Sequence, residues 1–144
     1  MSSSYLVSLA LAIVFAALAA LHVYWAIAGG AAEVASAAIP TRTDGAPLFR
    51  PSARSTLAVA AALIAAAVVV LGRGGVFAFD IPAILYRVGA WGLAAVLLLR
   101  AIGDFRYVGL FKRERRSAFA RWDSAVYSPL CAVLGAGVVY LAIA

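Results

Sequence analysis

Charge is scarce in this chain. Only 12% of its 144 residues are charged, whereas 66% are hydrophobic, and about 25% charged residues is usual for soluble globular domains. The mean hydropathy of +1.02 agrees with this composition. So few charged side chains cannot cover the surface of a water-soluble fold. The sequence therefore predicts that lipid surrounds much of the protein.

Histidine and cysteine are equally scarce, with one of each, His22 and Cys131. A single cysteine excludes an internal disulfide. One His, one Cys and scattered carboxylates do not form a zinc or di-iron site, and a bis-histidine haem would need His22 from two chains. Phosphate-binding glycine loops and Ser/His/Asp signatures are also missing from the sequence. We therefore predict no metal and no cofactor.

The net charge of +6 does not indicate nucleic-acid binding, because no recognisable binding module surrounds the basic residues. Lys and Arg accumulate instead in the cytoplasmic loops of membrane proteins. We expect membrane lipids, with anionic headgroups at the cytoplasmic face, as the partners of these residues. The sequence leaves open whether the chain forms a homo-oligomer.

Four long apolar stretches predict transmembrane helices, at residues 5–28, 56–72, 83–103 and 126–144. The first would reach ~36 Å as a helix, and a hydrocarbon core is about 30 Å thick. The stretches are rich in Ala and Leu and lack the alternation of membrane strands. We predict an all-α fold, a single domain that forms a four-transmembrane-helix bundle, with a short interfacial amphipathic segment. In the first connector, residues 31–39 are long enough for one or two helical turns.

The basic residues divide unequally between the two sides of such a bundle. Four spans place both termini and the connector 73–82 on one side, and the connectors 29–55 and 104–125 on the other. The first side holds only Arg73 and Arg87, and the second holds the other ten: Arg42, Arg50, Arg54, Arg100, Arg106, Lys112, Arg113, Arg115, Arg116 and Arg121. This asymmetry predicts that both long connectors lie in the cytoplasm and both termini outside.

His22, Tyr24 and Trp25 lie near the cytoplasmic end of the first span. On a helix His22 and Trp25 share a face, while Tyr24 points about 200° from His22. An interfacial aromatic belt with a backbone-bonded histidine explains these residues. Because intramembrane ionisable residues are often functional, His22 is also a candidate for ligand binding or proton transfer.

Arg100, Asp104, Arg106 and Tyr107 follow the third span. If the helix continues through Gly103, then Arg100, Asp104 and Tyr107 line one face, and Arg100 and Asp104 can form an ion pair. Such a pair can simply hold the helix end. Alternatively the group is an anion or headgroup site, for which arginine is well suited.

Asp123 and Tyr127 stand where the chain enters the fourth span. Asp123 is placed to cap that helix, with Pro129 one turn inside it, or Ser128 caps and Pro129 is the first helical residue. Before them, Phe111, Arg115, Ala118 and Trp122 recur at helical spacing. That spacing predicts a short amphipathic helix, with Lys112 to Arg116 in contact with anionic lipid.

These groups all fall near one membrane face, where four helices could enclose a polar cavity. We therefore expect a binding protein for an amphiphilic or anionic small molecule or a lipid headgroup. Arg100 and Arg106 would take its anionic part, His22 and Asp104 would supply hydrogen bonds or protons, and Tyr24, Trp25, Tyr107 and Tyr127 would complete the site. One alternative is a membrane-embedded enzyme with His22 and Asp104 or Asp123 as acid and base. Another is an accessory subunit that docks a partner through the basic connector 104–125.

Three segments, HVYWAIAGG, RAIGDFRYVGLFKR and FARWDSAVYSPLC, resemble a family of small bacterial membrane proteins classed as a domain of unknown function. With the spans, the likeness covers nearly the whole chain. Family members often have a Trp-Gly pair soon after the Gly-Gly, where this chain has Ala31-Ala32-Glu33-Val34. The resemblance implies a four-span, multi-pass protein of the bacterial plasma (inner) membrane and no particular activity.

Overall fold

A computed structural model describes residues 2–28, 37–42, 44, 46–77 and 80–144. Its main elements are helices α1 (Ser3–Ala28), α3 (Ala53–Arg73), α4 (Ala83–Ile102), α5 (Ala118–Trp122) and α6 (Ser128–Ile143), with a π-helical turn η1 (Asp123–Tyr127) between the last two. Since α5, η1 and α6 follow one another without a break, they form one long helix, Ala118–Ile143. The predicted all-α fold with four spans is confirmed, and the described residues contain no strand beyond an isolated bridge between Thr41 and Pro47.

The outward faces of these helices are apolar. Ile13, Val96 and Val133 are each about two-thirds exposed, at 68%, 65% and 68%. Water would penalise such a surface, whereas hydrocarbon would not. All four long helices have the length and composition to cross a membrane. The molecule is thus a multi-pass membrane protein.

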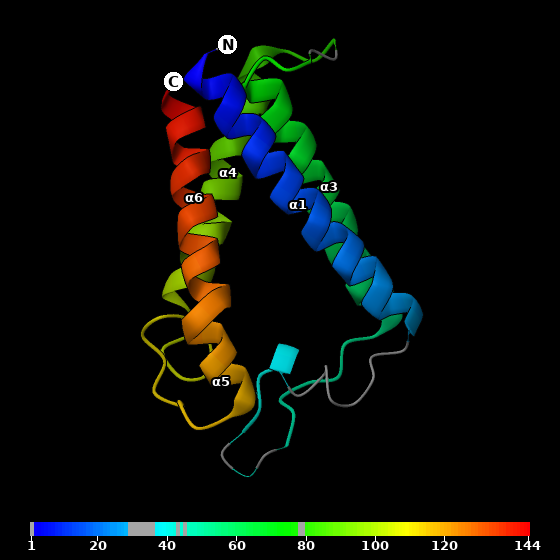
Figure 1. Cartoon of the computed structure of the whole chain (residues 1–144), viewed down its shortest axis with the longest axis vertical. Coiled ribbons are helices and arrows are strands. Elements are labelled where there is room, and N and C mark those ends of the chain that lie inside the picture. Colours follow the sequence, from blue (N-terminus) through cyan, green and yellow to red (C-terminus); the bar gives the residue numbers. More distant parts are fainter. Residues whose placement is uncertain (1, 29–36, 43, 45, 78–79) are drawn as a thin grey trace.

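The four helices pack as two antiparallel pairs. Helix α1 contacts mainly α3, and α4 contacts mainly α6. The pairs approach each other at the end that carries both termini and diverge toward the opposite end (Figure 1). The core lies in the half where they approach, and it consists largely of small and branched residues: Leu11, Ala12, Phe15, Ala66, Ala67, Val70, Ala90, Ala94, Leu134, Val138, Leu141 and Ala142.

Glycine permits the close contacts between these helices. A Cβ on Gly135 would lie 2.8 Å from the Leu98 side chain of α4, and one on Gly137 would lie 3.1 Å from Leu11 of α1. Membrane helices lack a hydrophobic drive to associate, so they depend on this kind of close packing. The packing therefore fixes how α6 sits against both neighbours.

One expectation about the connectors is wrong, and another lies mostly outside the described residues. The amphipathic helix predicted from Phe111 is wrong as drawn, because residues 103–117 are irregular and helix starts only at Ala118. Ser117 caps that helix by accepting a hydrogen bond from Ala120 N at 3.0 Å. This serine cap determines where the helix starts, and the apolar spacing that begins at Phe111 does not. Most of the expected turns at residues 31–39 lie outside the described residues. Within the part of this segment that the structure describes, Ala37 and Ala38 are helical.

Candidate functional site

Asp123 is a fully buried carboxylate that joins three parts of the chain. Its Oδ1 accepts a hydrogen bond from the Arg100 guanidinium of α4 at 2.8 Å, and its Oδ2 accepts one from Lys112 Nζ at 2.9 Å. The amide of Gly109 also donates to Oδ2 at 2.9 Å. Two opposite charges and an amide satisfy this carboxylate, which makes its burial tolerable.

Lys112 is buried together with Asp123, and its side chain is 1% exposed. Its ammonium donates to Asp123, to the carbonyl of Gly109 at 2.9 Å and to Ser124 Oγ at 2.7 Å. An ammonium has three protons, so these three acceptors use them all. The prediction that Lys112 contacts lipid is therefore wrong.

The π turn places Asp123 inside a helix instead of at its start. The amide of Ser128 bonds to the carbonyl of Asp123, one residue further than in an α-helix. Pro129 follows, and a proline ring would clash with the carbonyl four residues earlier in a regular helix. The wider turn accommodates Pro129 without breaking the helix. The expectation that Asp123 caps the fourth helix is wrong, since Ser117 is the cap.

A tight loop follows α4. Gly103 and Gly109 have φ of 87° and 96°. The two ends of the loop lie so close that a Cβ on either glycine would collide with the backbone at the other end. Within it, Asp104 Oδ1 accepts hydrogen bonds from the amides of Arg106, Tyr107 and Val108, at 2.7–2.9 Å. Although partial burial opposes the charged form, these amides hold the pKa of Asp104 below its ordinary value.

This loop rules out the predicted ion pair between Arg100 and Asp104. The helix ends at Ile102, so Asp104 lies beyond it and is not placed four helical positions after Arg100. The Arg100 side chain pairs with Asp123 instead. Arg100 Nη1 also lies 3.5 Å from Ser128 Oγ. Gly109, Lys112, Ser124 and Ser128 are the residues that sequence reasoning missed. The signal for a turn was the pair of glycines that brackets DFRYV.

A pocket of about 610 Å³ opens on the outer side of the loop and is lined by Asp104, Phe105, Arg106, Tyr107, Arg113 and Glu114. The Arg106 guanidinium lies over the Tyr107 ring, 5.1 Å from its centroid, within the range of a cation–π contact. The amide of Glu114 donates to the carbonyl of Arg106 at 2.9 Å and joins the two sides of the pocket. The site thus contains two arginines and two carboxylates.

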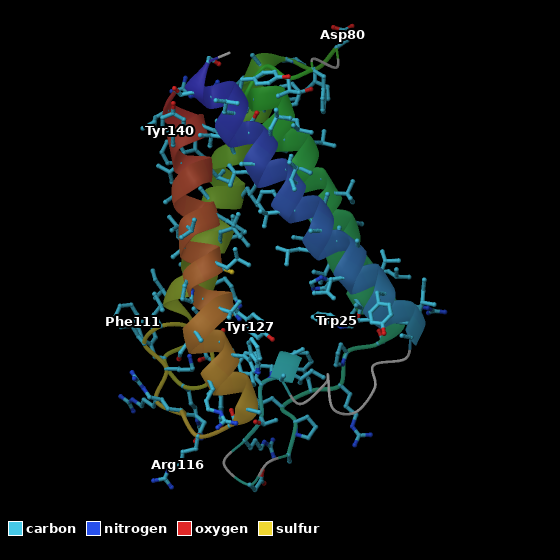
Figure 2. The ribbon with its side chains drawn as sticks, viewed as in Figure 1. Trp25, Asp80, Phe111, Arg116, Tyr127 and Tyr140 are labelled. Atoms are coloured by element: carbon cyan, nitrogen blue, oxygen red, sulfur yellow. The ribbon has the colours of Figure 1, made fainter. Side chains whose placement is uncertain are left out.

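The first-span candidates lie on the other helix pair. His22 Nδ1 is 2.7 Å from the carbonyl of Leu18, and its ring lies 5.2 Å from Trp25. Tyr24 is 62% exposed and points outward. Figure 2 shows Trp25 on α1 and Tyr127 on the opposite pair, at the end where the pairs diverge. Among the described residues no hydrogen bond joins His22 to Asp104 or Asp123, so the shared cavity stays a prediction.

Tyr127 connects the fourth span to the first connector. Its hydroxyl donates to the carbonyl of Ala37 at 3.3 Å, and its ring lies 6.1 Å from Phe119. Tyr127 thus links the start of the fourth span to the first connector by a hydrogen bond. The described residues contain no group of three His, Cys, Asp or Glu side chains that could hold a metal ion.

Four apolar spans and a buried ion-pair network at one end define a small multi-pass membrane protein. The chain belongs to the family described as "Protein of unknown function (DUF3995)", whose sequence model matches residues 15–138. This match confirms the resemblance noted from the three segments. No curated protein and no solved structure matches the chain.

Proposed function

We propose that the protein binds a phosphate-bearing amphiphile in the pocket beside the 103–109 loop. The observation that carries this proposal is the set of charges in the lining, because Arg106, Arg113, Asp104 and Glu114 all line one pocket. Arginine's planar fork of donors suits a phosphate. The two carboxylates suit an ammonium group, so the charge pattern favours a zwitterionic headgroup such as phosphoethanolamine.

The surroundings of the pocket favour an amphiphile over a small soluble ion. Phe105, which lines the pocket, and Phe111 are 58% and 62% exposed, and their ring centroids lie 6.5 Å apart. Phe105 has a φ of 61°, a strained conformation for a bulky side chain that is often associated with function. Aromatic rings at the membrane boundary sit between headgroups and acyl chains. A lipid could place its headgroup in the pocket and its chains along these rings.

The loop is built to hold such a site in place. Asp104 and Glu114 each use one carboxylate oxygen on the backbone, and Glu114 Oε1 accepts from the amide of Arg116 at 2.9 Å. Behind the loop, Asp123 fixes Gly109 and Lys112. A preformed site loses less entropy when it binds. Arg100 belongs to this frame, and we leave it out of the proposed ligand set.

By this proposal the pocket faces the cytoplasm of a bacterial cell. Ten of the twelve basic residues lie on that side of the bundle. Arg115 and Arg116 are exposed there, and Figure 2 shows Arg116 pointing away from the helices. They would add attraction to an anionic membrane surface. Docking of an accessory partner through the same connector stays a prediction.

Acid–base catalysis receives less support from the geometry. Both oxygens of Asp123 are engaged by Arg100, Lys112 and Gly109. The lowered pKa of Asp104 keeps that carboxylate ionised and makes it a weak base. Neither carboxylate is poised to exchange protons with His22 near neutral pH.

Native mass spectrometry tests the proposal. The protein would be released from nanodiscs that contain phosphatidylethanolamine, phosphatidylglycerol or phosphatidylcholine, and retained lipids counted. We expect retention of phosphatidylethanolamine above the other two, because it alone has a positively charged group with N–H protons that can pair with the carboxylates. The double variant Arg106→Gln/Arg113→Gln should lose at least about tenfold in affinity, as expected for charged hydrogen bonds.

Arg115→Gln/Arg116→Gln is the matched control, since it removes the same charge from the same connector outside the pocket lining. It should retain the lipid as the wild type does. An equal loss in both double variants would mean that the connector attracts lipid only by its overall charge, and the pocket proposal would be wrong.

A further inference from the structure

A second polar pocket lies at the opposite end of the molecule, where α3 ends and α4 begins. Its volume is about 470 Å³, and it is lined by Gly72, Arg73, Gly75, Ala83, Ile84, Tyr86 and Arg87. The termini lie at this same end (Figure 1). This pocket therefore belongs to neither the loop nor the network around Asp123.

Two buried donors in this lining have no hydrogen-bond partner among the described residues. Tyr86 is 8% exposed, and neither its hydroxyl nor Arg73 Nε forms a hydrogen bond within the described part of the chain. A buried polar group without a partner costs about 1–3 kcal/mol. Such groups call for an explanation, and a bound ligand is one. Both groups can donate a hydrogen bond to an acceptor on a ligand.

The packing holds Tyr86 where it is. A Cβ on Gly72 would collide with the Tyr86 ring, so the ring lies directly against the backbone of α3. The chain then leaves α3 through Gly75, with φ of 70°. The amides of Gly74, Gly75 and Val76 donate to carbonyls of the last helical turn. Because these carbonyls are satisfied, the end of α3 opposes a nearby anion less strongly.

The charges around the pocket all have one sign. Arg73 and Arg87 line it, no carboxylate does, and neither arginine forms an ion pair among the described residues. Asp80 lies out at the tip of the connector, away from the helices (Figure 2). The first turn of α4 contains no acidic residue and no side-chain cap, so its positive dipole end faces the same region.

We propose that this pocket binds a phosphate-type anion, either free or as the headgroup of an anionic lipid. The guanidinium groups of Arg73 and Arg87 would pair with the phosphate oxygens, and the Tyr86 hydroxyl would donate a further hydrogen bond. This site differs in charge from the loop pocket, where two carboxylates balance two arginines. The two ends would then select different headgroups, a net-negative one here and a zwitterionic one at the loop.

The test uses the full chain in a neutral detergent, with two probes: inorganic phosphate and a short-chain phosphatidylglycerol, with phosphatidylcholine as reference. The NMR resonance of Arg73 Nε–H reports binding, because this donor has no hydrogen-bond partner within the described residues. We expect a saturable shift with phosphatidylglycerol and none with phosphatidylcholine. Tyr86→Phe keeps the ring against Gly72 and should raise the dissociation constant at least about tenfold.

Tyr140→Phe is the control, since this tyrosine of α6 is 38% exposed, near the same end, and outside the pocket (Figure 2). A shift with both inorganic phosphate and the lipid would assign a site for phosphate itself, and a shift with the lipid alone would assign a headgroup site. Arg106→Gln/Arg113→Gln should leave the Arg73 resonance unchanged whether or not the loop pocket binds lipid. The proposal is wrong if neither inorganic phosphate nor the lipid shifts the resonance, or if Tyr86→Phe binds with the same affinity as the wild type.

Discussion

At the scale of single residues, Asp123 forms both ion pairs found among the described residues, one with Arg100 and one with Lys112. Asp123→Asn would leave the Lys112 ammonium buried without its counter-charge, and breaking a buried pair this way costs about 3–5 kcal/mol. We expect the free energy of unfolding in detergent to fall by that amount. Asp80→Asn, at an exposed carboxylate, should change it by less than about 0.5 kcal/mol.

A double-mutant cycle then separates the pair from its surroundings. Lys112→Met together with Asp123→Asn removes both charges, so much of the penalty of the single change should be regained. If the loss of unfolding free energy in the double variant equals the sum of the losses in the two single variants, Asp123 and Lys112 do not stabilise each other.

The residue pairing could not be read from the sequence. Local spacing relates Arg100 only to neighbours three or four positions away, which led to Asp104 as its partner. Its actual partner lies 23 positions further on, and it becomes adjacent only because α4 and α6 pack together. Lys112 stands in a basic run that is typical of a solvated surface, and nothing local distinguishes it from Arg113. The sequence singles out Arg106 and Tyr107 as candidates, because a polar cluster at a span end is unusual, and their role in a site stays a prediction.

At the scale of an element, the 103–109 loop depends on its glycines. Gly109→Ala would place a Cβ against the carbonyl of Ile102 at a φ of 96°, which a side chain rarely adopts. We expect a loss of more than about 1 kcal/mol in the free energy of unfolding, with weaker protection of the Gly109 amide from hydrogen exchange. Gly92→Ala lies in α4 with open space around the new methyl. It should stabilise the protein or leave it unchanged.

The same loop should respond to pH through Asp104. Its three amide hydrogen bonds favour the ionised carboxylate, so its folded-state pKa lies below the ordinary value of 3.8. The stabilisation is therefore fully present above that value and is lost as the pH falls through the folded-state pKa. Amide resonances of Arg106, Tyr107 and Val108 should shift together with one midpoint below 3.8. Asp104→Asn should abolish the transition, and a midpoint at or above 3.8 would contradict the role assigned to these amides.

At the scale of the whole molecule, the four spans followed from composition, because long apolar runs without the alternation of membrane strands form helices, which satisfy their own backbone in lipid. The arrangement into two pairs that diverge at one end did not, since it depends on close contacts such as Gly135 with Leu98 and Gly72 with Tyr86. A glycine in an apolar run shows that packing is close, but not which helix is the partner. The start of the fourth helix was also misplaced, because Ser117 and the π turn act together around Pro129.

The distribution of basic residues predicts the orientation of the whole protein in the membrane. The side with the termini and Asp80 has only Arg73 and Arg87, so we expect it to face outward, and the loop pocket to face the cytoplasm. With Cys131→Ser as background, Asp80→Cys should react with a membrane-impermeant maleimide on intact cells. Arg116→Cys, on an exposed side chain at the other end, should react only in inverted vesicles. The reverse pattern would place the Arg73–Tyr86 pocket in the cytoplasm and the loop pocket outside. Both sites would then face lipids of the opposite leaflet from the ones expected here.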